Sequence, residues 1–138
     1  MLTDFFWLWG ILGLSFACFG GHLIVGPLVK KLWKITVADF RKKGIQIPDK
    51  PINSNATVSF WYGVTERTIY WLCFILCLPE GIAVWLTFKA VVRWKMSEEP
   101  DPRHIPGSSI YMIGTAMNII IGFLGALIAF RDFSFIIP

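Results

Sequence analysis

The residues best placed to do chemistry are carboxylates inside apolar stretches. Glu80 stands between Pro79 and Gly81, in a run of about 20 otherwise uncharged residues that is long enough to cross a bilayer. An ionisable side chain near the middle of such a segment is costly, and it usually faces protein or a water-filled cavity. Glu80 is therefore the first candidate for a catalytic base or a proton carrier. The alternative is a neutral carboxyl that caps the backbone gap left by Pro79.

A second carboxylate shares a spacing with Glu80. Polar or small side chains recur every seven residues at Glu66, Cys73, Glu80 and Thr87. On a straight helix these positions drift by only about 20° per step. If the segment is one helix, both carboxylates face the same cleft between helices.

His22 is the third candidate for catalysis. It follows Gly20 and Gly21 near the end of the first apolar block. If the first two membrane helices are antiparallel neighbours, His22 lies near Glu66, and the two form an element of a proton relay. The alternative is a histidine that is hydrogen-bonded to a backbone carbonyl.

Several cations are placed where lipid phosphate would lie. Arg67, Lys89 and Arg93 flank the second apolar block, and a basic cluster follows the first, namely Lys30, Lys31 and Lys34. Such residues either bind anionic head groups or only anchor the helix ends at the interface. The sequence therefore predicts contact with membrane lipids, and anionic lipids in particular.

The sequence predicts no metal and no cofactor. The three cysteines, Cys18, Cys73 and Cys77, lie in apolar blocks without the spacing of a metal site, and small packing residues are the simpler interpretation. Glycine-rich phosphate loops and nucleophile motifs are absent. A net charge of +4 is too small to indicate a nucleic-acid partner.

The composition is that of a membrane protein. Of the 138 residues 55% are hydrophobic and only 16% are charged, and the apolar residues form long blocks. We expect one membrane domain over residues 1–138 with an all-α fold and three transmembrane helices, at about 4–29, 65–94 and 108–130. The first block is too long for the apolar core of a signal peptide. Pro79 predicts a kink in the second helix, and a re-entrant pair of half-helices is the alternative.

Two polar loops separate these spans. Pro27 and the basic cluster end the first span, and residues 28–43 are expected to form a short basic helix at the interface. Residues 44–56 form an irregular loop, and the prolines of residues 98–106 exclude a helix there.

Small residues at intervals of four predict two helix-packing stripes. One stripe is Gly13, Ala17 and Gly21, and the other is Gly114, Asn118, Gly122 and Ala126. Small residues allow close helix approach, which matters because lipid provides no hydrophobic drive for association. The amide of Asn118 needs a partner, and a hydrogen bond to Glu80 is the expected one.

The cations also predict an orientation. Most lysines and arginines follow the first span, so that loop is placed in the cytoplasm. With three spans, the N-terminus is then outside and the C-terminus is cytoplasmic.

Part of the chain resembles a group of uncharacterised bacterial and phage-associated integral membrane proteins. The resemblance covers residues 63–129 and rests on Glu66-Arg67, on Lys89-x-x-x-Arg93 and on Tyr111-x-x-Gly114-Thr115. It implies that these residues act together and that the membrane is a bacterial inner membrane. It implies no activity.

The sequence leaves two main function classes open, and a channel-forming oligomer is a third possibility. The leading hypothesis is a non-enzymatic membrane subunit or scaffold, which self-associates or joins other membrane subunits and uses its basic loop. The alternative is a small enzyme or carrier that acts on a lipid head group or a proton through Glu80 or Glu66.

Overall fold

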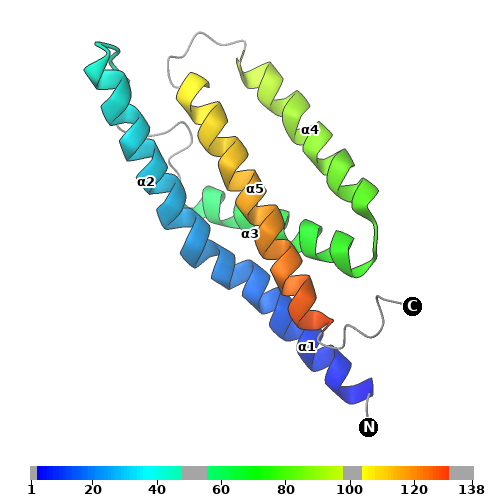
Figure 1. The fold of residues 1–138 in the computed structure, drawn as a ribbon. Coiled ribbons are helices and arrows are strands. Elements are labelled where there is room, and N and C mark those ends of the chain that lie inside the picture. Colours follow the sequence, from blue (N-terminus) through cyan, green and yellow to red (C-terminus); the bar gives the residue numbers. More distant parts are fainter. Residues whose placement is uncertain (1–2, 48–55, 98–103, 131–138) are drawn as a thin grey trace.

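The computed structural model describes residues 3–47, 56–97 and 104–130, and every element in these ranges is a helix. The elements in chain order are α1 (Thr3–Ser15), the π-helical η1 (Phe16–Gly20), α2 (Gly21–Lys42), α3 (Ala56–Ile75), α4 (Pro79–Ser97) and α5 (His104–Ala129). The prediction that prolines exclude a helix over 98–106 is wrong for residues 104–106, because Pro106 lies in the first turn of α5, where its missing N–H is not needed. Figure 1 shows them as an elongated bundle.

The first three elements form one continuous rod. The helix passes through Pro27 and ends only after Lys42, where Lys43 N donates to Asp39 O at 3.2 Å and Gly44 adopts a φ of +77°. Glycine adopts that conformation at little cost, so it is a common helix terminator. The prediction that Pro27 ends the first helix and that residues 28–43 form a separate one is therefore wrong.

The second predicted span is two helices. α3 ends at Ile75 and α4 begins at Pro79, with Cys77 at a φ of 51° in the turn between them. Pro79 occupies the first position of α4, where its missing N–H is not needed, and it disfavours a helical conformation at Leu78. The prediction of one kinked helix over 65–94 is thus wrong, and a helical hairpin, close to the stated alternative, is found.

The rod and α5 are antiparallel neighbours. A Cβ atom on Gly13 would meet the backbone of Gly125 and Ala129 near the end of α5. Near the beginning of α5, Ile110 shares a buried cluster with Trp33 and Val37 of α2. The start of α1 and the end of α5 consequently lie at the same end of the bundle (Figure 1). The prediction that the N-terminus and the C-terminus lie on opposite sides of a membrane assumed three crossings. This arrangement does not support it.

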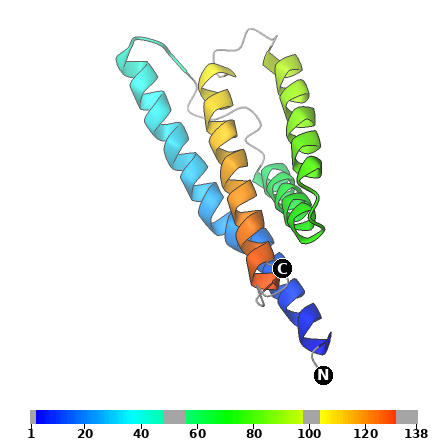
Figure 2. The ribbon, with the colours of Figure 1, turned by 45° about the vertical axis from the view of Figure 1, so that its right-hand side comes forward.

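The α3–α4 hairpin completes the bundle. α3 crosses the rod and α5 obliquely, and α4 returns alongside α3 as its main neighbour (Figure 2). Cys73 lies against Gly81 near the turn, and Glu66 lies against Lys89 further from it. The side chain of Lys89, near the middle of α4, thereby reaches Thr115 of α5.

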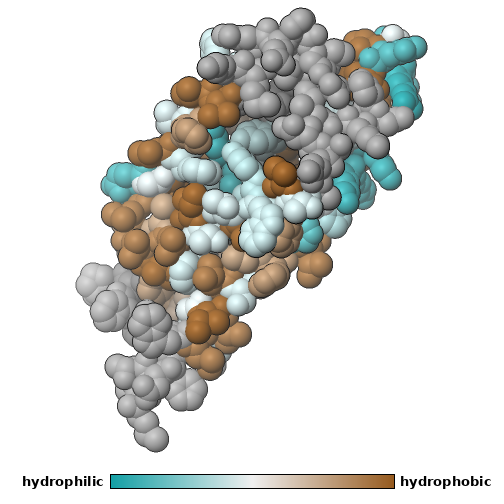
Figure 3. Space-filling view, turned by 180° about the vertical axis from the view of Figure 1, so that it is seen from behind, coloured by the Kyte–Doolittle hydropathy of each residue, from teal (hydrophilic) through white to brown (hydrophobic). Residues whose placement is uncertain are grey.

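Two of the described helices are long and apolar enough to span a membrane, Leu8–Lys42 and Ser109–Ala129. At a rise of about 1.5 Å per residue, the first is roughly 50 Å long, so it exceeds a hydrocarbon core of about 30 Å. Neither α3 nor α4 meets the same criterion. Figure 3 shows hydrophobic side chains over much of one outer face, and Leu23 and Val84 are 75% and 70% exposed.

Candidate functional site

Five polar side chains are buried where α3, α4 and α5 meet. Their exposed fractions are between 2% and 7%, and they are Glu66, Arg67, Lys89, Thr115 and Asn118. We call this set the ionic cluster. Buried charges are rare unless they are paired, so their partners define what the cluster can do.

Glu66 is the centre of the ionic cluster. Lys89 Nζ donates to Glu66 Oε1 as a buried salt bridge. Asn118 Nδ2 donates to Glu66 Oε2 at 2.7 Å. Lys89 Nζ also donates to Thr115 Oγ1 at 2.6 Å. Both carboxylate oxygens are therefore occupied, and three helices are joined through one side chain.

Arg67 extends the cluster to the N-terminal rod. One guanidinium nitrogen donates to Asn118 Oδ1 at 3.1 Å, and the other donates to the backbone carbonyl of Cys18 at 3.0 Å. A Cβ atom at Gly21 or Gly63 would run into the Arg67 side chain. Glycine at these two positions leaves the space in which the guanidinium crosses between helices.

The carbonyl that Arg67 binds belongs to the π-helical turn η1. A π-turn changes the regular pairing of backbone groups, and such turns often occur at functional sites. Here Cys18 O accepts from Arg67, and Cys18 Sγ lies 3.5 Å from Thr68 Oγ1. The irregular turn thus gives α3 a polar attachment point within an apolar stretch of the rod.

Aromatic rings surround the cation of Lys89. Its Nζ lies 4.4 Å from the ring centroid of Tyr111 and 5.7 Å from that of Tyr62. A ring face attracts a cation, and more strongly where water is excluded. Tyr70 of α3 is fully buried, and among the described residues no hydrogen-bond partner is found for its hydroxyl or for Trp85 Nε1.

The ionic cluster is compact and closed. It contains one carboxylate against two cations, and the amide of Asn118 bridges Glu66 and Arg67. Two cavities at the end of α2 are lined by residues between 33 and 47, and neither includes a member of the cluster. Within the described ranges, no three His, Cys, Asp or Glu residues are grouped to hold a metal ion.

Glu80 lies outside the ionic cluster. It is an exposed residue in the first turn of α4, beyond the turn that separates it from Glu66. The seven-residue spacing assumed one helix, and the hairpin breaks that register. The predicted hydrogen bond between Glu80 and Asn118 is wrong, since the Asn118 amide binds Glu66 and Arg67.

His22 is likewise apart from Glu66. Its side chain is exposed, and its ring packs edge-on against Phe60 with centroids 4.7 Å apart. The predicted Glu66–His22 pair is not formed, and Glu66 binds Lys89 and Asn118 instead.

The predicted phosphate-binding cations divide into two groups. Arg67 and Lys89 are buried in the ionic cluster, where no lipid phosphate reaches them. The lysines on α2 are exposed, namely Lys30, Lys31 and Lys34. Arg93 lies in α4, and its side chain is outside the described part of the structure.

The two small-residue stripes lie at helix contacts. Gly13 and Ala17 face Gly125 of α5, and Gly122 faces Tyr70 of α3. Gly21 faces Arg67, and Gly114 faces Val29. Gly10 lies nearly one turn before Gly13, and a Cβ atom there would meet nothing within 4 Å. The stripe therefore marks one face of the rod.

Sequence reasoning did not pair Glu66 with Lys89. The available signal was the presence of both ionisable residues in or beside apolar runs, each needing a buried partner. Of the residues quoted for the family resemblance, Lys89 binds Glu66 and Thr115 and lies against the ring of Tyr111. Gly114 instead faces Val29 of α2, and the side chain of Arg93 is outside the described part of the structure. No family model, no curated protein and no solved structure matches the chain.

Proposed function

We propose that the protein is a non-enzymatic scaffold of a membrane, an integral subunit that holds partner subunits through α4 and anionic lipid through the basic end of α2. The observation that supports this proposal is the closure of the ionic cluster. Its carboxylate and both of its cations have hydrogen-bond partners on neighbouring helices, and no member of the cluster lines the two cavities at the end of α2.

A closed cluster suits a structural joint better than a catalytic centre. A general base must lie within hydrogen-bond reach of the proton that it removes. Both oxygens of Glu66 are already used by Lys89 and Asn118. Buried ion pairs contribute little net stability, but they can fix the register of packed helices. The cluster thus favours one placement of the hairpin against α5.

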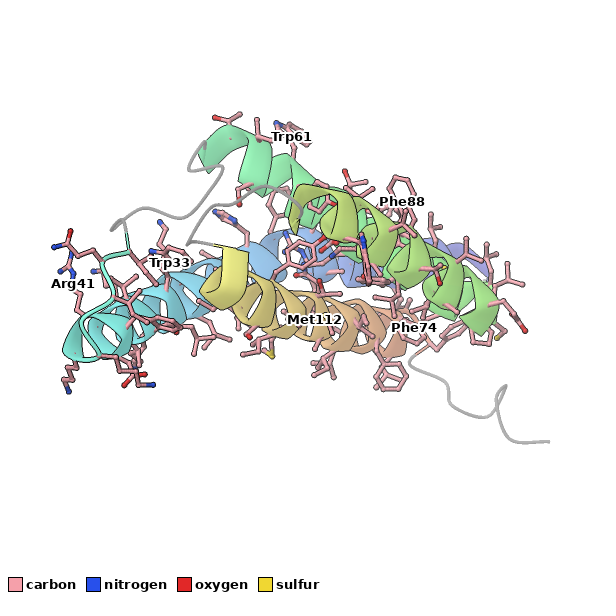
Figure 4. The ribbon with its side chains drawn as sticks, turned by 90° about the horizontal axis from the view of Figure 1, so that it is seen from above. Trp33, Arg41, Trp61, Phe74, Phe88 and Met112 are labelled. Carbon is pink, nitrogen blue, oxygen red and sulfur yellow. The ribbon has the colours of Figure 1, made fainter. Side chains whose placement is uncertain are left out.

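The outer face of α4 is the surface proposed to bind a partner. α4 packs mainly against α3, and it exposes Val84, Phe88 and Val91 at 70%, 55% and 64%. These residues follow helical spacing, so they share one face, and Phe88 lies on the outer side in Figure 4. An exposed apolar face of this kind is typical of contact with another membrane helix or with lipid.

The orientation belongs to the same proposal. The excess of lysine and arginine at the end of α2 favours the cytoplasm for that end. Because α5 runs antiparallel to the rod, the start of α1 and the end of α5 are then on the opposite side together.

The alternative function is an enzyme or carrier that uses Glu66 or Glu80 on a lipid head group or a proton. The geometry gives this alternative less support. The carboxylate of Glu66 is bound to Lys89, and Glu80 is exposed. The turn between α3 and α4 separates the two carboxylates.

Purification in a mild detergent, followed by cross-linking mass spectrometry, tests the scaffold. We expect a stoichiometric membrane partner with cross-links to α4. Replacing Val84, Phe88 and Val91 with alanine should remove the partner. A matched triple variant replaces Ile113, Ile120 and Leu124 of α5, which are 43%, 50% and 42% exposed, and should retain it. Absence of a partner, or its equal loss from both variants, contradicts the proposal.

A further inference from the structure

The α3–α4 hairpin buries charged side chains and exposes apolar ones. Glu66, Arg67 and Lys89 are 3%, 2% and 3% exposed, whereas Leu76 and Leu78 in the turn are 60% and 51% exposed. A hairpin in water favours the opposite arrangement, because water solvates ions well and apolar side chains poorly. The outer surface of the hairpin therefore suits the interior of a bilayer or the surface of another membrane helix.

Contacts with α5 give the depth of the turn along the apolar span Ser109–Ala129. Phe74, near the end of α3, packs against Phe123 with ring centroids 5.1 Å apart, and the turn lies beside the second half of α5 (Figure 1). Phe123 is six residues before the end of that span, or about 9 Å along a helix. Across the turn, Gly81 lies against Cys73. If α5 crosses a bilayer, the turn and the start of α4 are thus within the hydrocarbon.

Glu80 is an exception to the apolar exterior of the hairpin. It directly follows Pro79, the first residue of α4, and it is exposed. At about 100° per residue it shares one face of α4 with Val84, Phe88 and Val91, the surface proposed to bind a partner. Lys89, which is buried against α3, is nine residues further and lies on the opposite side of the helix.

An exposed carboxylate at this depth requires a polar partner. Ionisable groups in the hydrocarbon region are costly, and they usually pair with one another or face water. The exposed neighbours of Glu80 on its face of α4 are apolar. The free N–H groups in the first turn of a helix favour a negative charge, but they compensate for only a small part of its desolvation.

We propose that the partner held by α4 is a transmembrane helix of a different protein, and that this helix carries a lysine or arginine at the level of Glu80. Its apolar side chains cover Val84, Phe88 and Val91, and its cation pairs with the carboxylate. A second copy of this chain does not fit. Two copies of equal orientation would meet through the same patch and bring Glu80 against Glu80. The inference rests on the proposed function and adds the chemistry of the partner.

The test uses the full chain in its native membrane, with photoreactive benzoylphenylalanine in place of Ala83, which is exposed beside this face. We expect cross-links to one partner helix that has a lysine or arginine within about one turn of the cross-linked residue. Glu80→Lys should lower recovery of the partner by roughly tenfold, because it places like charges together. Replacing the partner's basic residue with glutamate should restore recovery by Glu80→Lys.

Two further variants serve as controls. Glu80→Gln preserves shape and should also weaken recovery, which separates loss of charge from misfolding. Asp39→Lys makes the same charge reversal at an exposed acid of α2, and it should retain the partner.

Four outcomes overturn the inference. They are a cross-linked helix without a nearby basic residue, cross-links only between copies of this chain, full recovery by both Glu80 variants, and no rescue by the charge exchange. The scaffold itself still stands if a different membrane protein is recovered and the alanine variant of Val84, Phe88 and Val91 releases it. Recovery of no partner by any variant contradicts both proposals.

Discussion

At the scale of the residue, the molecule is organised around Glu66. This carboxylate is 3% exposed and receives hydrogen bonds from α4 and α5. Taking a charge out of water costs several kcal/mol, and only close partners compensate for it. The few side chains that bind Glu66 are therefore expected to make a large contribution to the stability of the fold.

Removing one member of the salt bridge should be far worse than removing both. Lys89→Met leaves the Glu66 carboxylate buried without its cation, and we expect a loss of about 3–5 kcal/mol in the free energy of unfolding. Lys89→Met combined with Glu66→Gln should recover much of that loss, since glutamine can still accept from Asn118. The measurement is reversible unfolding in mixed micelles with a denaturing detergent.

The control for Lys89 is Lys31→Met. It makes the same change at an exposed position, so we expect an effect within about 0.5 kcal/mol. If Lys89→Met were as mild as its control, the buried ion pair would not be a structural joint, and Glu66 would again be a candidate for chemistry.

At the scale of the element, the turn at Leu76–Leu78 decides the architecture. Leu78 N donates to Cys73 O at 2.8 Å and Cys77 N donates to Phe74 O at 3.2 Å, which ends α3 before Pro79 starts α4. A continuous helix through these residues would carry Lys89 away from Glu66. The ionic cluster exists because the hairpin folds back.

Replacing Cys77 should change the stability in opposite directions in a hairpin and in a continuous helix. The φ of 51° costs an L-residue roughly 1–2 kcal/mol, so Cys77→Gly should be neutral or stabilising by up to about 1 kcal/mol. Cys77→Val should be destabilising, because a branched side chain fits this conformation poorly. Thermal unfolding in detergent measures both.

Leu76 provides the comparison for Cys77. It is the preceding residue of the turn and is 60% exposed, and it does not have a positive φ. Leu76→Gly should therefore cost stability. A loss from glycine at both positions, together with tolerance of valine at Cys77, would favour a continuous helix and contradict the hairpin.

At the scale of the whole molecule, the antiparallel rod and α5 form the frame. The hairpin lies across them, fixed by Arg67 on one side and by Lys89 on the other. The apolar exterior and the basic end of α2 are the exposed surfaces through which we propose that the protein contacts lipid and partners.

The two chain ends should be on the same side of the membrane. Fusions of a compartment-sensitive reporter to the N-terminus and to the C-terminus should give matching signals, both opposite to a cysteine introduced at Lys42 and labelled from the cytoplasm. Opposite signals from the two fusions would indicate an odd number of crossings, and the hairpin would then have to open into one span.

The sequence by itself determined the class of fold and the surfaces of close packing. Long apolar blocks predict helices, because helices satisfy the backbone internally where water is absent. The stripe of Gly13, Ala17 and Gly21 is readable because small residues recur at a helical period. The basic end of α2 is likewise visible as a local run of charge.

Only the tertiary structure decided which polar residues meet. Glu66 and Lys89 are 23 positions apart, and their contact depends on a single turn at Cys77 that the pattern of hydrophobicity does not encode. The same turn moved Glu80 to the surface and gave Asn118 a different partner. Local sequence sets periodicity and composition, whereas the pairing of buried charges follows from how the helices fold back and how their backbones approach.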